Sequence, residues 1–334
     1  MLDGRSVLIT GGTGSFGQKL ADTILRRHSP QRLIVYSRDE LKQFEMREVF
    51  PRREFPALRF VVGDVRDRER LLRACDGVDV LVHAAALKQV PHCEAHPLEA
   101  VKTNVLGAAN VIDAAVERKV ERVLALSTDK AAHPVNLYGA TKLCAEKLFT
   151  CPTNYEGQDR TRFAVARYGN VVGSRGSGIP LFLRQREAGL LTITDPRMTR
   201  FWLTLEQAAE FALFCLASMD RGETFVPKLP SMNVLDLARA IAPGCRTQVV
   251  GIRPGEKLHE VLIPEESAAH TLERERCYVI LPHASVWDFG EYAVRRGGRP
   301  CPENFRYASD TNAEWLSIDE LRSLALLEEA ALAA

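Results

Sequence analysis

The sequence predicts an α/β fold of the Rossmann type, in which a doubly wound parallel sheet is followed by a smaller C-terminal substrate-binding lobe. Three observations predict it. Short β-branched runs alternate with longer helical patterns, a glycine-rich turn follows the first run, and the alternation weakens after residue 172. Near-continuous apolar strands separated by helices are typical of parallel sheets that are covered on both faces.

The expected strands and helices follow one another in order along the first half of the chain. The strands are predicted at residues 6–10, 32–37, 59–64, 78–85, 122–128 and 162–171. Helices are predicted between them at 17–27, 97–118 and 138–149, and later at 205–219 and 234–242. We therefore expect a dinucleotide-binding Rossmann domain over residues 1–172. Residues 173–334 are expected to form mostly the substrate lobe, from which segments could return to the first domain.

The amino-acid composition disfavours nucleic-acid-binding, membrane and secreted proteins. The 334 residues include 44 Lys+Arg and 43 Asp+Glu, with no basic block of the kind that binds nucleic acid. No apolar stretch reaches the roughly 20 residues that span a bilayer, and the first residues lack the apolar core of a secretory signal. The eight cysteines include no CxxC pair, which favours reduced thiols. These features predict a soluble cytoplasmic enzyme with no nucleic-acid or membrane partner.

The glycine-rich turn "GGTGSFG" directly follows the first predicted strand and begins a helix. Gly11, Gly14 and Gly17 would allow a tight turn, close approach of a pyrophosphate, and close packing of helix on strand. The helix N-terminus would then face the anion. This position predicts dinucleotide binding, and the spacing resembles the GxxGxxG form of short-chain dehydrogenase/reductases.

The end of the second strand, "YSRDELK", bears on the choice between NADP and NAD. Ser37, Arg38 and Lys42 are candidate ligands of a 2′-phosphate, whereas Asp39 leaves NAD open. Solvated surface charges are the alternative interpretation of Arg38 and Lys42. The segment favours NADP.

Further candidates for the dinucleotide follow the third and fourth strands. Asp64 and Val65 are expected near the adenine because they end a strand at the carboxyl edge of the sheet. Small residues from Ala84 to Ala86 would let the backbone approach the ribose and nicotinamide, although close packing alone would also explain them.

Tyr138 and Lys142 are predicted to share one face of a helix, since they are four residues apart. A buried ammonium beside a phenol should lower the phenol pKa from about 10. The tyrosine could then exchange a proton with a sugar hydroxyl while hydride moves to or from nicotinamide. Together with the glycine turn, this pair predicts a redox site.

Asp129 and Lys130 follow a strand that ends in "ST", where such folds bind ligands. They suit an elimination in which a base removes a C5 proton and an acid helps to expel a C6 hydroxyl. Lys130 can be the base only when neutral, so we expect its pKa to be lowered by burial, by Lys142 and by a cationic nicotinamide. Asp129 as the acid requires a raised pKa. A surface ion pair is the alternative.

Longer blocks add specificity to these short motifs. They read "STDKAAHPVNLYGATK", "AAALKQVPHCEAHPLEAVKTNVLGAANV", "RYGNVVGSRGSGIP", "ITDPRMTRFW", "IRPGEKLHEVLIP" and "NFRYASDTNAEWL". Together they resemble the family of inverting UDP-N-acetylglucosamine 4,6-dehydratases within the extended short-chain dehydrogenase/reductases, in order and over nearly the whole chain. The resemblance implies conversion of UDP-N-acetylglucosamine to a 4-keto-6-deoxy sugar with inversion at C5, the first step of pseudaminic acid biosynthesis. It also implies tightly bound NADP and a homo-oligomer, either a hexamer or an assembly built from dimers.

The resemblance assigns roles to matching positions. Lys130 would be the base, Asp129 the acid, and Tyr138 with Lys142 the redox pair; Tyr138 is also the suspected proton donor for inversion. The implied cofactor residues are Gly11, Thr13, Gly14, Ser15, Phe16, Gly17, Ser37, Arg38, Asp39, Glu40, Leu41, Lys42, Asp64, Val65, Ala84, Lys88, Leu126, Ser127, Tyr138, Lys142 and Val171. The implied substrate residues are Lys88, Asn170, Arg175, Gly176, Ser177, Gly178, Ile179, Thr194, Arg200, Arg253 and Glu256.

Three other interpretations remain open or are disfavoured. His83, His92, Cys93 and His96 are close in sequence, but their spacing matches no standard zinc site, so no metal is expected. A UDP-sugar epimerase, or a dehydratase with a further epimerase activity, is the closest alternative function. A non-catalytic NADP-binding regulator is the alternative of another class. Lys130 discriminates, because an epimerase acting at C4 needs no acid and base for elimination.

Overall fold

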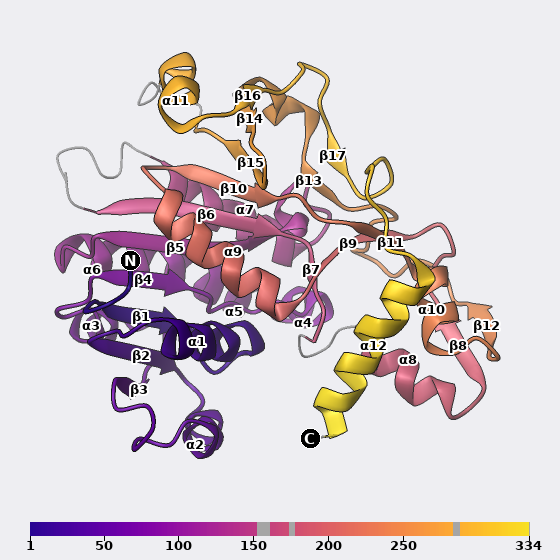
Figure 1. Cartoon of the computed structure of the whole chain (residues 1–334), viewed down its shortest axis with the longest axis horizontal. Helices are drawn as coiled ribbons and strands as arrows, with labels where there is room; N and C mark the ends of the chain where they lie inside the picture. Colours follow the sequence, from indigo (N-terminus) through magenta and orange to yellow (C-terminus); the bar gives the residue numbers. More distant parts are fainter. Residues whose placement is uncertain (152–160, 174–177, 283–287, 334) are drawn as a thin grey trace.

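A ten-stranded sheet forms the centre of the molecule (Figure 1). The structure, a computed structural model, describes residues 1–151, 161–173, 178–282 and 288–333. Neighbouring strands run parallel in the order β3-β2-β1-β4-β5-β6-β10, and β15, β14 and β16 extend the sheet in antiparallel pairs. The first strands are β1 (Ser6–Thr10), β2 (Arg32–Ser37), β3 (Leu58–Val62), β4 (Val80–His83), β5 (Arg122–Thr128) and β6 (Arg162–Tyr168). The predicted Rossmann-type fold is confirmed.

Helices cover both faces of the sheet, because the central strands carry apolar side chains on both of their faces. Val7 and Ile9 of β1 belong to one buried cluster, and Leu8 between them belongs to the other. The first cluster includes residues of α1 (Ser15–Arg27) and α9 (Leu205–Ser218). The second includes residues of α3 (Arg68–Ala74), α6 (Gly107–Glu117) and α7 (Leu137–Thr150). This two-sided burial is what near-continuous apolar strands predict.

Strands from the second half of the chain complete the sheet. β10 (Glu223–Pro227) pairs in parallel with β6, and β15 (Cys277–Ile280) pairs with β10 in the opposite direction. β14 (Thr271–Glu273) and β16 (Arg299–Pro300) follow. The chain beyond residue 172 therefore contributes to the large sheet as well as to a smaller lobe.

The smaller lobe lies beside the carboxyl ends of the parallel strands, at the right of Figure 1. Ile179, Phe182 and Leu237 are among its buried core residues. Its elements are β7 (Asn170–Val171), α8 (Gly178–Arg186), β8 (Leu190–Ile193), β9 (Thr199–Leu203), β11 (Ser231–Asn233), α10 (Val234–Ile241), β12 (Arg246–Val249) and α12 (Ile318–Ala333). Elements at its border or near the far sheet edge are β13 (Val261–Ile263), the 3-10 helix η4 (Glu265–His270), α11 (Phe289–Arg296) and β17 (Tyr307–Ala308).

The helical stretch predicted over residues 97–118 is confirmed, but it contains a π-helical turn that was not predicted. α5 (Pro97–Val101) is followed by η1 (Lys102–Leu106) and then by α6. Inside the turn, Asn104 exchanges hydrogen bonds with the backbone N–H and C=O of Leu87 and also donates to Thr141. These bonds tie the turn to the loop after β4. The remaining helices are α2 (Glu40–Val49), α4 (Val90–Ala95) and the 3-10 helix η2 (Asp129–Ala131).

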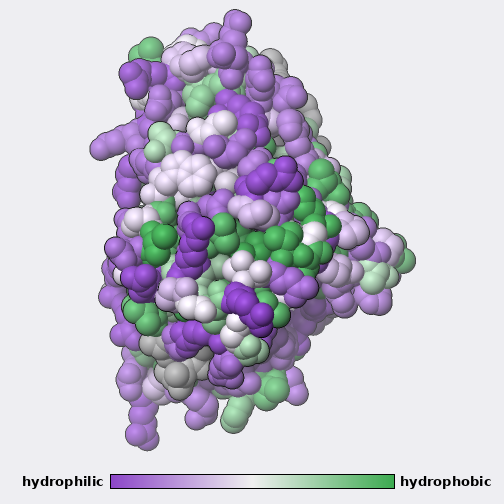
Figure 2. All heavy atoms as spheres, turned by 90° about the vertical axis from the view of Figure 1, so that its right-hand side faces the viewer, coloured by the Kyte–Doolittle hydropathy of each residue, from purple (hydrophilic) through white to green (hydrophobic). Residues whose placement is uncertain are grey.

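The face at the right of Figure 1 carries a band of hydrophobic side chains between hydrophilic ones (Figure 2). Exposed hydrophobic residues of the smaller lobe include Leu181, Val249, Leu326 and Leu327. Within the described ranges, no helix combines the length and the apolar character that crossing a bilayer requires.

Candidate active site

The turn between β1 and α1 leaves no room for side chains at two of its glycines. Gly11 has a φ of +66°, and a Cβ atom there would lie 2.8 Å from the backbone of Ala85. A Cβ atom at Gly17 would lie 2.6 Å from the Cα atom of Gly12. α1 begins after Gly14 without a side-chain cap, and this end of the helix borders a cavity. Such a turn fits the pyrophosphate of a dinucleotide.

Charged side chains gather at the end of β2. The Oδ1 atom of Asp39 accepts a hydrogen bond from the backbone N–H of Lys42 and so caps α2, and its Oδ2 atom lies 2.7 Å from the Lys42 Nζ atom. Arg38 Nη1 lies 3.6 Å from Asp64 Oδ2, while half of the Arg38 side chain is exposed. With Asp39 engaged in the cap, Ser37, Arg38 and Lys42 present hydroxyl and cationic groups to the cavity.

One cavity of about 1020 Å³ brings most residues of both predicted binding sets together with the four predicted catalytic residues. The cofactor set contributes Gly11, Thr13, Gly14, Ser15, Phe16, Gly17, Ser37, Arg38, Asp39, Lys42, Asp64, Val65, Ala84, Lys88, Leu126, Ser127, Tyr138, Lys142 and Val171. The substrate set contributes Lys88, Asn170, Gly178, Thr194, Arg200, Arg253 and Glu256. Asp129 and Lys130 line the same space.

A few predicted binding residues lie elsewhere. Glu40 and Leu41 are exposed on α2 and are not among the residues that line the cavity. Ile179 is wholly buried in the core of the smaller lobe. Arg175, Gly176 and Ser177 lie outside the described residues.

Two predicted ligands of the UDP group already make polar contacts within the chain. The Arg200 guanidinium donates to the carbonyl oxygens of Thr199, Lys257 and Leu258. Arg253 pairs with Glu256, with its Nε atom 2.9 Å from Oε1. The Arg253 side chain is 69% exposed, so it is the one of the two that can turn toward a ligand with little obstruction.

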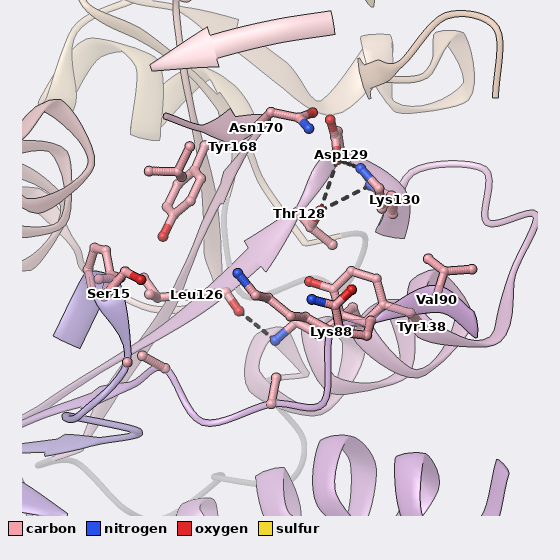
Figure 3. A pocket seen from close by; sticks show the side chains of 18 of the residues that line it. Ser15, Lys88, Val90, Leu126, Thr128, Asp129, Lys130, Tyr138, Tyr168 and Asn170 are labelled. Carbon is pink, nitrogen blue, oxygen red and sulfur yellow. Dashed lines mark hydrogen bonds and ion pairs between the residues drawn. The ribbon is translucent and has the colours of Figure 1, made fainter. Parts of the chain in front are cut away.

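The Lys130 ammonium lies between two buried carboxylates. Its Nζ atom is 3.1 Å from Asp129 Oδ1 and 3.3 Å from Glu260 Oε1. Thr128 donates its hydroxyl hydrogen to the same Asp129 oxygen at 2.9 Å. Thr128, Asp129 and Lys130 gather on one side of the Tyr138 ring (Figure 3). The predicted elimination pair and redox tyrosine therefore share one site.

The expected lowering of the Lys130 pKa is wrong for the protein without its ligands. Burial does lower this pKa, but Asp129 and Glu260 together raise it above its ordinary value. The ammonium form is thus the resting form. The expected rise in the Asp129 pKa is confirmed, because burial and the neighbouring Glu260 charge both favour the protonated carboxyl.

The expected lowering of the Tyr138 pKa is also wrong for the protein alone. Burial raises the pKa of Tyr138 to about 12, although the Lys130 charge and a hydrogen bond with Thr128 act in the opposite direction. The predicted partner, Lys142, donates instead to the carbonyl oxygen of Leu126 at 2.6 Å, the bond marked by the dashed line at Leu126 in Figure 3. Burial lowers the pKa of Lys142 to about 8, so its charge is easily lost.

Several buried polar atoms in this cavity have no hydrogen-bond partner among the described residues. They are Thr103 Oγ1, Ser127 Oγ, Asp129 Oδ2, Asn170 Oδ1 and Glu260 Oε2. Buried polar atoms in native proteins are nearly always hydrogen-bonded. These oxygens are therefore positions at which hydroxyl and amide groups of a bound molecule can complete the network.

Sequence reasoning missed several polar or aromatic residues of the cavity, among them Thr128, Tyr168, Trp202, Lys257 and Glu260. Thr128 directly precedes the predicted acid, Asp129, and this position in the chain could have identified Thr128 as a site residue. The sequence signal for Glu260 was weaker: it is an acidic residue directly before the buried strand β13. Its relation to Lys130 depends on a contact across 130 positions in the sequence and could not be predicted locally.

The histidines that are close in sequence have ordinary partners. The His83 ring lies 2.8 Å from the Thr10 hydroxyl, and His92 packs against His96 with ring centroids 4.7 Å apart. Over the described part of the chain, no three His, Cys, Asp or Glu side chains are grouped so that they could hold a metal ion.

Comparisons with known proteins agree with this geometry. A family described as "Polysaccharide biosynthesis protein" matches residues 7–282. The chain is 49% identical to a UDP-N-acetylglucosamine 4,6-dehydratase (inverting) of Campylobacter jejuni, over 96% of this chain and 97% of the relative. It is 38% identical to a UDP-glucose 4-epimerase of Rickettsia canadensis, over 96% and 95%. The resemblance to inverting dehydratases is confirmed.

A solved structure has the same fold throughout. The X-ray structure of Pen from Bacillus thuringiensis superposes with a TM-score of 0.88 and is 35% identical, covering 98% of this chain and 99% of that chain.

Proposed function

Because the chain belongs to the polysaccharide biosynthesis protein family, we propose that it converts UDP-N-acetylglucosamine to UDP-2-acetamido-2,6-dideoxy-β-L-arabino-hex-4-ulose with NADP as its cofactor. The chain is an enzyme of the hydro-lyase type, a nucleotide-sugar 4,6-dehydratase. Inversion at C5 makes the product an L-arabino sugar. Such a product would start pseudaminic acid biosynthesis.

One observation carries the proposal. A tyrosine suited to redox chemistry, an amine and an acid lie in the cavity that also borders the glycine turn. Tyr138 alone would suffice for oxidation and reduction at C4. The hydrogen-bonded pair Asp129–Lys130 adds the two groups that loss of water from C5 and C6 requires.

The redox half of the reaction depends on Tyr138. Bound NADP would supply a carrier that takes hydride from C4 and returns it to C6. In its phenolate form Tyr138 takes the proton of the C4 hydroxyl; the charge of Lys130 and the Thr128 hydroxyl favour this form, against the burial that raises the pKa of Tyr138 in the protein alone. The resulting ketone at C4 acidifies the C5 proton. We propose that Lys142, which donates to the Leu126 carbonyl in the protein alone, supports the Tyr138 phenolate as a nearby positive charge on the same helix face.

The elimination half depends on a proton moving within the Asp129–Lys130 pair. Transfer along the 3.1 Å contact gives a neutral amine and a protonated carboxyl without any net change of charge. Lys130 then takes the C5 proton, while Asp129 donates to the C6 hydroxyl, which leaves as water. After hydride reaches C6, Tyr138 returns its proton to the opposite face of C5. Both residues of the pair are then back in their resting forms.

The preference for NADP is supported by the end of β2. Asp39, the one carboxylate there that could favour a free ribose hydroxyl, is occupied in capping α2. Arg38 and Lys42 are cations beside the same cavity, as a 2′-phosphate requires. UDP-N-acetylglucosamine would occupy the part toward the smaller lobe, near Asn170, Thr194 and Arg253.

A homo-oligomer, either a hexamer or an assembly of dimers, belongs to the same proposal. Support comes from the band of exposed hydrophobic side chains in Figure 2, since large apolar patches on a surface often mark contacts between proteins.

A C4 epimerase is the second candidate, because relatives of that name align over nearly the whole chain. Epimerisation needs hydride transfer and Tyr138 but no elimination pair. The buried contact between Asp129 and Lys130 favours the dehydratase.

One experiment tests these alternatives. The purified protein is incubated with UDP-N-acetylglucosamine in deuterated water, and the sugar is followed by proton NMR. A new C6 methyl signal, deuterium at C5 and L-arabino couplings are expected. D-xylo couplings would contradict inversion, and a changed configuration at C4 without a methyl signal would favour the epimerase. If the protein binds NADP but leaves every UDP-sugar unaltered, the result would favour the alternative of a non-catalytic NADP-binding regulator.

A further inference from the structure

Glu260 is the buried charge of the cavity to which the reaction described above gives no role. Only 2% of its side chain is exposed, and it comes from the segment before β13 rather than from the predicted motif around Lys130. Its backbone is fixed on both sides, since its N–H donates to Ser309 Oγ and its C=O accepts from the Ser309 N–H. The carboxylate is therefore held in place by the fold.

Three cations surround this carboxylate. Glu260 Oε1 lies 3.3 Å from Lys130 Nζ and 3.8 Å from Arg200 Nε, and Oε2 lies 3.7 Å from Lys257 Nζ. Lys257 in turn donates to the carbonyl oxygen of Ala132, and Arg200 donates to backbone carbonyls. Both cations are thus anchored independently of any ligand.

The pKa values of the two carboxylates beside Lys130 are shifted in opposite directions by their surroundings. Burial raises the Glu260 pKa, but Lys130, Arg200 and Lys257 together lower it below its ordinary value. The pKa of Asp129 is raised. Two titratable groups whose pKa values are moved apart are suited to different roles. Glu260 remains charged, while Asp129 is the carboxyl that can gain and lose a proton.

We propose that Glu260 is a positioning residue that provides a fixed negative charge beside the Asp129–Lys130 pair, and that this charge sets the pH range in which the pair shares one proton. The proposal rests on the proposed function, because that shared proton makes Lys130 the base and Asp129 the acid. The charged or titratable groups that face the pair are Glu260, Arg200, Lys257 and Tyr138. Arg200 and Lys257 are neutralised in part by Glu260 itself.

The sign of the effect follows from electrostatics. A negative charge favours proton binding by both Asp129 and Lys130. Removal of this charge lets both groups release their protons at lower pH. Both the acidic and the basic limb of the plot of dehydration rate against pH should therefore move to lower pH. A charge at this distance is expected to move each limb by about one pH unit or more. Loss of a merely structural contact would lower the rate at every pH and leave both limbs in place.

The test compares kcat against pH for the wild type, Glu260→Gln, Glu260→Asp and the control Glu223→Gln. Glu223 is also fully buried, but it is hydrogen-bonded to Tyr292 and does not line the cavity. Both limbs should move toward acid in Glu260→Gln, move less in Glu260→Asp, and stay in place in the control. If both limbs of the pH profile stay in place in the Glu260 variants, the proposal is overturned. If Glu260→Gln does not fold, the pH profile of Glu260→Asp decides between these outcomes.

A second measurement needs no substrate. NMR of protein carrying ¹³C-labelled aspartate, with the Asp129 signal assigned from Asp129→Asn, should show Asp129 losing its proton at lower pH in Glu260→Gln than in the wild type. An equal midpoint in the two proteins would contradict the role of Glu260. Failure of the wild type to dehydrate UDP-N-acetylglucosamine would contradict only the proposed function.

Discussion

The Lys130 Nζ atom lies 3.1 Å from Asp129 Oδ1, so one hydrogen bond joins the two groups that we propose as the base and the acid of dehydration. The ion pair and the pair of neutral groups hold the same number of protons. Lys130 can therefore be an ammonium at rest and still become a base, because its proton needs to move only to the adjoining carboxylate. This relation replaces the expectation that Lys130 becomes a base through a lowered pKa.

Replacing Lys130 by alanine should stop loss of water while C4 oxidation continues. The rate of dehydration should fall by about 100- to 10,000-fold, which is the usual contribution of a general base. Formation of the C6 methyl group by NMR and the absorbance of the reduced nicotinamide measure the two steps separately. Dehydration at the wild-type rate would remove the lyase assignment.

Replacing Tyr138 by phenylalanine should stop the reaction before C4 oxidation. The ring and its packing remain, but no hydroxyl is left to take the C4 proton, so a loss of about 100- to 10,000-fold is expected. Reduced nicotinamide should not appear in this variant, in contrast to Lys130→Ala. Binding of UDP-N-acetylglucosamine, measured by calorimetry, should remain within a few-fold of the wild type, roughly 1 kcal/mol. Oxidation at an unchanged rate would show that another residue takes the proton.

Replacing Arg38 by alanine should weaken NADP binding and leave NAD binding nearly unchanged. The guanidinium is half exposed beside the cavity, where a 2′-phosphate would replace its longer contact with Asp64. Loss of a charge-assisted hydrogen bond of this kind costs about 1.5–3 kcal/mol, or roughly 10- to 100-fold in affinity. Titration with each dinucleotide measures the ratio. Equal weakening for both would contradict NADP selectivity through this residue.

Replacing Lys142 by methionine should change the pH dependence of stability. The pKa of this lysine is lowered to about 8 in the folded protein from an ordinary value of 10.5, so the unfolded chain binds more protons between these pH values. The folded wild type consequently gains stability as pH rises through this window, by up to about 3 kcal/mol. The methionine variant lacks this gain. Urea unfolding of both proteins at pH values below and above the window measures the difference, and parallel curves would contradict a buried ammonium.

Local patterns were sufficient for much of the fold. The apolar run at β1 and the glycines that follow it are determined by neighbouring residues, since a strand, a tight turn and a helix start each depend on a few positions. Tyr138 and Lys142 likewise share a helix face by their spacing alone. The π-helical turn at η1 was not predictable, because its bonds from Asn104 to Leu87 and Thr141 are tertiary contacts.

The sequence by itself determined the Rossmann-type sheet and the glycine-rich turn, and it predicted the residues that we propose as the redox pair and the elimination pair. Only the tertiary structure decided the charge states within them. Glu260 reaches Lys130 because β13 packs near η2, and Asp129 together with this added carboxylate reverses the expected direction of the Lys130 pKa shift. Lys142 loses part of its affinity for protons because α7 buries its amine against the Leu126 carbonyl. A pKa depends on burial and on charges within a few ångströms, and those neighbours are fixed by folding rather than by adjacency in the chain.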